Sequence, residues 1–169
     1  MIRLLQSTDA KDYWGLRLNA LRDNPEAFVI SYEEALNREA PIEGVAKNLK
    51  NKENFTYGAF VDGVLIGVIT MLQESPSKLN HKAIILGMYV NPESRGNGIG
   101  RSLLQEAINK AKDIKEIERL NLTVVTSNIR AKKLYSALGF STYGTEEEAL
   151  KFNGQYFDEA HMTLKISWD

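Results

Sequence analysis

The residues best suited to chemistry in this chain form a run of alternating glycines behind an arginine, Arg95-Gly96-Asn97-Gly98-Ile99-Gly100. The run follows an apolar, strand-like segment (82–90) and opens a segment whose apolar residues recur at helical spacing (99–111). Glycines allow bare backbone N–H groups to converge on one point, and a helix that begins there adds the positive end of its dipole. The expected ligand of this loop is therefore an anion.

The spacing of the glycines distinguishes three kinds of phosphate-binding loop. A P-loop requires Gly, four residues and then Gly-Lys-Ser/Thr, and no lysine follows these glycines at that spacing. A dinucleotide fingerprint needs Gly-x-Gly-x-x-Gly directly after a strand, but here the third glycine comes one residue early and residues 91–94 lengthen the connection. Glu116 and Glu118 lie about where the ribose-binding acid of that motif falls, so a nucleotide-linked oxidoreductase stays open as an alternative. The remaining pattern, Arg/Gln-x-x-Gly-x-Gly/Ala, is met by Arg95, Gly98 and Gly100.

A second motif occupies residues 128–140, which read Asn-Ile-Arg-Ala-Lys-Lys-Leu-Tyr-Ser-Ala-Leu-Gly-Phe. Ser127 or Asn128 caps the first N–H groups of a short helix, and Gly139 supplies the left-handed residue after it. Together with the glycine loop, this motif resembles the GNAT superfamily of N-acetyltransferases. The resemblance is firm over residues 86–140 and elsewhere rests on the order of the expected elements.

The resemblance implies an acyltransferase that moves the acetyl group of acetyl-coenzyme A to a primary amine by direct attack, without a metal. It implies that Tyr135 is the general acid for the coenzyme A thiolate, because a phenol donates a proton at neutral pH. The residues that it implies for coenzyme binding are Met88, Tyr89, Val90, Arg95, Gly96, Asn97, Gly98, Ile99, Gly100, Arg101, Asn128 and Tyr135.

Three of these residues also have a structural role that needs no ligand. Tyr135 is also suited to a helix that packs on a core, Asn128 to a helix cap, and Arg101 to the exposed first turn of a helix. For the whole chain, the alternative is an acyl-coenzyme A sensor that keeps the loop without turnover. The presence of Tyr135 favours the enzyme.

The general base is not assigned by the sequence. Many members of the family place a glutamate on the strand that corresponds to 82–90, but this segment contains no carboxylate. Glu74, Tyr89 and a chain of water molecules are the candidates.

The resemblance implies that the acceptor side is formed by the first two helices and the last hairpin, and the segments 24–28 and 31–34 resemble the acceptor lid of the family. The acids Glu26, Glu33 and Glu34 would attract a cationic amine, although acids early in a helix also stabilise its dipole. The residues implied for substrate binding are Phe28, Tyr32, Glu33 and Glu74. The acceptor is a small-molecule amine, a protein N-terminus or a lysine amine, and a homodimer is compatible with the sequence.

Composition narrows the function further. The chain has 169 residues, a size that predicts a single domain (1–169), and its 21 basic and 22 acidic residues give no reason to expect nucleic acid as a partner. It contains no cysteine, which excludes disulfides and a Cys nucleophile, and its two histidines, His81 and His161, are isolated. We therefore expect no metal site. The lack of a long apolar run predicts no membrane partner and a cytoplasmic location.

The predicted fold class is α/β (α+β), with a mixed, mostly antiparallel central sheet of about seven strands flanked by helices. Asp62-Gly63 and Asn153-Gly154 predict two-residue hairpin turns. Helices are expected over 9–22, 41–51, 99–111 and 128–138, and Ser31-Tyr32-Glu33-Glu34 forms a capping box for a further short helix. Strands are expected over 2–5, 55–61, 64–72, 82–90, 120–125, 140–143, 150–152 and 156–166. The GNAT resemblance implies that the fourth and fifth strands, 82–90 and 120–125, splay apart to admit the pantetheine arm of the coenzyme.

Overall fold

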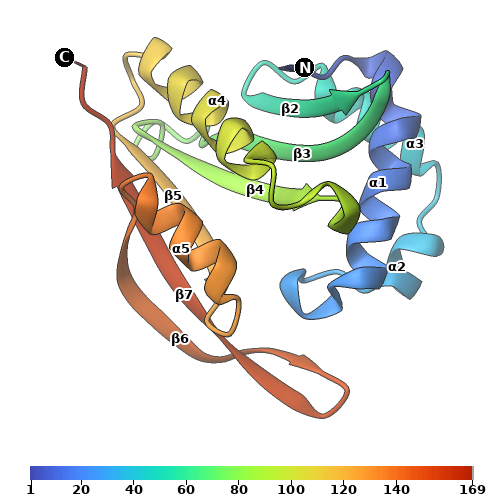
Figure 1. Cartoon of the computed structure of the whole chain (residues 1–169). Coiled ribbons are helices and arrows are strands. Elements are labelled where there is room, and N and C mark those ends of the chain that lie inside the picture. Colours follow the sequence, from blue (N-terminus) through green and yellow to red (C-terminus); the bar gives the residue numbers. More distant parts are fainter. Residues whose placement is uncertain (169) are drawn as a thin grey trace.

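A seven-stranded mixed sheet carries helices on both faces in the computed structural model, which describes residues 1–168 (Figure 1). The strand order is β1-β2-β3-β4-β5-β7-β6, and β4 and β5 form the parallel pair. All other neighbouring strands are antiparallel, which confirms the predicted fold class. The strands are β1 (Ile2–Leu4), β2 (Asn54–Val61), β3 (Val64–Gln73), β4 (Lys82–Val90), β5 (Arg119–Val125), β6 (Ser141–Phe152) and β7 (Gln155–Lys165).

The helices divide between the two faces of the sheet and give each its own apolar core. Helices α4 (Ile99–Asp113) and α5 (Ile129–Ala137) cover one face, while α1 (Ala10–Asp23) and α3 (Pro41–Leu49) cover the other (Figure 1). Helical spacing predicted an apolar stripe that begins at Ile99, and α4 buries all of it except Ile99, which is half-buried; the buried residues are Leu103, Leu104, Ala107, Ile108 and Ala111. The remaining helical elements are η1 (Ser7–Asp9), η2 (Pro25–Ala27), α2 (Tyr32–Leu36) and η3 (Pro92–Ser94). No helix within residues 1–168 has the length and apolar character needed to cross a membrane.

The parallel strands β4 and β5 separate soon after they meet. Their pairing covers three residue pairs and ends at Ile84 and Asn121, although β4 continues to Val90 and β5 to Val125. Gly87 has a φ of 58°, and the register between β3 and β4 shifts beside it. Such a bulge bends a strand and increases its twist. The predicted splay is therefore confirmed, and the backbone of β4 beyond Ile84 has no partner strand on its β5 side.

The C-terminal hairpin differs from the prediction in one respect. Strand β6 is continuous over 141–152 instead of forming two short pieces, and a bulge interrupts its register between Glu146 and Leu150. Most of β6 is exposed on both faces, so its sequence lacks the apolar alternation that marks a half-buried strand. The hairpin turns at Asp62-Gly63 and Asn153-Gly154 are confirmed, because all four residues have the positive φ of a type I′ turn.

We expect Gly87→Ala to lower the free energy of unfolding by about 1 kcal/mol, since a φ of 58° is unfavourable for a residue with a Cβ. The loss comes from the backbone conformation and not from a steric clash, because an added Cβ would meet no atom closer than 3.8 Å. Gly15→Ala, in the interior of α1 with nothing within 4 Å, is the control and should raise stability by up to about 1 kcal/mol. Urea unfolding measures both. A shift of the same sign in the two variants would contradict this account of the bulge.

Candidate active site

A cavity of about 1250 Å³ passes through the gap between β4 and β5 and is lined from both faces of the sheet. Gly100 of α4 and Tyr135 of α5 line it on one face. Tyr13 and Arg17 of α1 and Leu49 of α3 line it on the other. Two reactants that enter from opposite faces would therefore meet within the sheet.

The glycine loop presents a series of free backbone N–H groups to this cavity. Among residues 1–168, no backbone N–H from Gly96 to Arg101 donates a hydrogen bond, and the first bond of α4 runs from Ser102 N–H to Gly98 O at 3.0 Å. Gly96 and Gly98 have φ of 90° and 76°, which turns successive N–H groups toward one side. Unpaired donors in such a concavity, at the positive end of a fifteen-residue helix, suit a phosphate.

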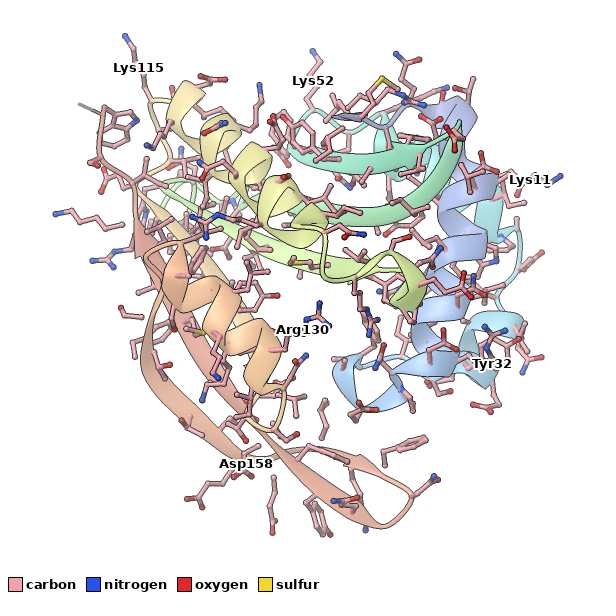
Figure 2. All side chains as sticks on the ribbon, viewed as in Figure 1. Lys11, Tyr32, Lys52, Lys115, Arg130 and Asp158 are labelled. Atoms are coloured by element: carbon pink, nitrogen blue, oxygen red, sulfur yellow. The ribbon has the colours of Figure 1, made fainter. Side chains whose placement is uncertain are left out.

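Arginine side chains take two different roles around this loop. The side chain of Arg95 is already engaged, since Nε donates to Val90 O at 2.8 Å and Nη2 to Asn24 Oδ1 at 3.3 Å. These hydrogen bonds hold the loop against β4. Arg101 and Arg130 are exposed and line the cavity at the first turns of α4 and α5; Figure 2 shows Arg130 projecting into the space beside α5. Their free guanidinium groups suit further phosphate oxygens.

Tyr135 directs its hydroxyl across the gap toward β4. The side chain is 8% exposed, and Oη donates to the Sδ of Met88 at 3.5 Å. Burial raises the pKa of Tyr135 to about 12, so the phenol is protonated at every physiological pH. Its ring also packs against Phe140, with centroids 6.0 Å apart, so the residue is part of the core as well.

The other residues expected to bind the coenzyme do not all line the cavity. The Oδ1 of Asn128 accepts from Ala131 N–H at 3.1 Å, so the cap is confirmed, and Asn128 also lines the cavity. The Tyr89 side chain turns toward α1, where its hydroxyl donates to Asp23 Oδ2 at 3.2 Å. Burial and the nearby Asp23 raise the pKa of Tyr89, so the phenol resists the loss of its proton and is poorly suited to act as a base. Met88, Val90 and Ile99 line the cavity, whereas Asn97 does not.

Of the four residues expected on the acceptor side, the structure places Phe28 at the cavity together with neighbouring Glu26. Tyr32 and Glu33 lie on α2 and do not line it. Glu74 is not brought to the cavity either, because it follows β3 beside the paired end of β4, where its carboxylate lies 3.6 Å from Lys82 Nζ. Glu34 forms the predicted capping box with Ser31, which accounts for that acid without a ligand.

Sequence reasoning missed two side chains of α1 that line the cavity, Trp14 and Arg17. Arg17 follows Tyr13 by four residues and Trp14 by three, so it lies beside each of them on the surface of the helix. That spacing was visible in the sequence, but nothing in the sequence placed this face of α1 opposite β4.

A further missed residue is Glu159 of β7, which also lines the cavity. Ala160 and Met162 belong to the core beneath α4 and α5, so alternation directs Glu159 to the α1 face. Burial, assisted by the neighbouring Glu146, raises the pKa of its carboxyl group, while His161 opposes that rise. Glu159 is thus a carboxylate at the gap that β4 itself does not provide.

Comparison with known proteins identifies the family. The sequence profile described as "Acetyltransferase (GNAT) family" matches residues 18–140, and the chain belongs to this family. An L-amino acid N-acetyltransferase of Escherichia coli K12 is 29% identical over 104 residues, covering 62% of this chain and 64% of that protein.

Solved structures extend the similarity to nearly the whole chain. A probable acetyltransferase from Staphylococcus epidermidis is 28% identical, with a TM-score of 0.80 and 99% of each chain covered. A putative acetyltransferase from Salmonella typhimurium, solved with its cofactor acetyl-CoA, has a TM-score of 0.85 at 18% identity and covers 99% of this chain and 94% of its own. The second of these shows the shared fold alone.

Proposed function

We propose that this protein transfers the acetyl group of acetyl-CoA to a primary amine. The observation that carries the proposal is the single cavity through the sheet, which joins the unpaired N–H groups of the glycine loop on one face to a pocket under α1 on the other. The pyrophosphate would bind those N–H groups, and the amides of the pantetheine arm would pair with the backbone of β4 that β5 leaves free. The amine enters from the α1 face.

The residues at the gap supply the parts of a direct transfer. Beside Gly87, backbone N–H groups of β4 on the side that β5 leaves unpaired would stabilise the oxyanion that forms when the amine attacks the thioester carbon. Tyr135 donates its proton to the departing sulfur, at the place where its hydroxyl now meets the Met88 thioether. Glu159 accepts the proton that the amine loses. A proton donor held at the gap favours turnover over an acyl-CoA sensor.

The coenzyme site predicts a ligand-specific thermal shift. Acetyl-CoA should raise the melting temperature in a saturable way, whereas NAD and ATP should not, because only acetyl-CoA fills both the loop and the strand gap. Gly98→Ala should remove this shift, since a Cβ at a φ of 76° forces the loop to change. Gly63→Ala is a matched control: φ is 80°, no atom lies within 4 Å of the added Cβ, and the residue is in a remote turn. Equal stabilisation by NAD would contradict the assignment.

The proton donor is tested by Tyr135→Phe. We expect turnover to fall by roughly 10²-fold or more while the affinity for acetyl-CoA stays nearly unchanged, because only the hydroxyl is removed. Tyr57→Phe is the control, since burial also raises the pKa of Tyr57 but that residue does not line the cavity. Steady-state kinetics and calorimetric binding give the two readouts. Full turnover in Tyr135→Phe would leave this residue with a packing role only.

The proton acceptor is tested through the pH profile. The carboxylate of Glu159 is lost as the pH falls through its pKa, and because this pKa is raised the loss begins at a higher pH than for an ordinary glutamate. Glu159→Gln should lower kcat/KM by roughly tenfold or more and remove this acidic limb. Glu146→Gln should instead move the limb to lower pH and keep the plateau, because Glu146 contributes to the rise. If the dependence of kcat/KM on pH is unchanged in both variants, solvent and not Glu159 accepts the proton of the amine.

A further inference from the structure

The acceptor side of the cavity carries charges of both signs: the arginines Arg17 and Arg38 line it together with the acids Glu26 and Glu159. Within residues 1–168, neither guanidinium forms an ion pair with a carboxylate. Burial lowers the pKa of Arg17, and the nearby charge of Arg38 lowers it further. A pair of like charges without a counter-ion is costly unless an anion binds between or beside them.

Arg17 occupies the more informative position of the two. It is partly buried, and its guanidinium lies over the ring of Phe28, 4.7 Å from the centroid. A Cβ built on Gly87 would lie 3.9 Å from Nη1 of Arg17. The charged group is therefore held directly beside the bulge of β4, where the acetyl carbon would be presented.

We propose that the acceptor is an amine with an acid group close to its nitrogen, as in an α-amino acid, and that Arg17 binds this acid group. The inference rests on the proposed acetyl transfer, because it uses the bulge of β4 as the reaction site. The distance between guanidinium and strand is short, so the acid group and the attacking nitrogen must be near neighbours in the substrate. Arg38, which is exposed, adds a second positive charge at the entrance.

The remaining lining of the pocket fits the rest of such a molecule. Trp14, Phe28, Ile30 and Val45 supply apolar surface for a side chain, and Asn48 and Asn51 add polar groups to the lining. The buried hydroxyls of Thr56 and Thr70 satisfy each other at 2.8 Å and require no polar group from a ligand. Glu159 supplies a negative charge for the amine. The pocket thus favours an amino acid with an apolar side chain.

The test compares L-leucine, L-methionine and L-phenylalanine with their α-carboxamides as acceptors. Rates are expressed per concentration of free amine, because loss of the carboxylate lowers the pKa of the amine. We expect the acids to exceed the amides in kcat/KM by roughly tenfold to hundredfold, the value of a charge-assisted hydrogen bond. Equal corrected rates, or spermidine as the best acceptor, would overturn the proposal.

Single substitutions show which arginine produces the preference for acids over amides. Arg17→Gln should lower kcat/KM for the acids by roughly tenfold to hundredfold, chiefly through KM, and leave the amides within about twofold. Arg38→Gln should cause a smaller loss of the same kind, because its charge is exposed. Lys11→Gln is the control, since Lys11 is an exposed cation of the same helix that points away from the cavity (Figure 2).

Two further measurements separate this proposal from its competitors. If Arg17 serves only to stack on Phe28, Arg17→Gln will lower the melting temperature and reduce acids and amides equally, which would overturn the proposal. Calorimetric binding of L-phenylalanine to the protein saturated with coenzyme A requires no turnover; we expect binding that Arg17→Gln weakens and Lys11→Gln does not. Binding of this kind without acetylation of any amine would refute the acetyl transfer and leave the anion site standing. Absence of binding, with an intact acetyl-CoA shift, would refute the anion site.

Discussion

Parallel pairing between β4 and β5 ends at Ile84 and Asn121, and the rest of the site depends on this early separation. Buried backbone groups require hydrogen-bond partners, so a strand edge opened inside a sheet is a place for a ligand that carries amides of its own. The bulge at Gly87 bends β4 away from its neighbour, and a glycine occupies it because φ is positive there. One backbone irregularity thus creates a passage between two faces that are otherwise closed by apolar cores.

The two faces of the sheet contribute different chemistry to this passage. On the α4 and α5 face, the site consists mostly of backbone: unpaired N–H groups of the glycine loop, fixed in place by the Arg95 side chain. On the α1 face it consists of side chains, among them Arg17 and Phe28. A ligand with a constant structure suits backbone recognition, which does not change with side-chain substitution. A variable acceptor suits side chains on a helix, where substitution changes the pocket without disturbing the fold.

Several groups at the gap are held in states that a purely structural role would not select. Burial keeps Tyr135 protonated, with the Met88 thioether as its acceptor, and raises the pKa of Glu159, while Arg17 forms no ion pair with a carboxylate within residues 1–168. Each arrangement disfavours the folded protein by itself, because desolvated polar groups normally find a strong partner. Their concentration around one cavity is typical of a site that a substrate completes.

The sequence by itself determined the features whose physics is local. The glycine loop, the Asp62-Gly63 and Asn153-Gly154 turns, the Ser31 cap and the helical stripe of α4 depend on residues a few positions apart, and all except the ligand of the loop are confirmed. Tertiary structure decided which distant segments meet. Strand β7 pairs between β5 and β6, so Glu159 lies at the gap. Helix α1 packs opposite β4, so Arg17 lines the cavity, whereas Glu74 lies beside Lys82 and away from it. These outcomes follow from the pairing and packing of segments far apart in the chain, and no local pattern of residues encodes such contacts.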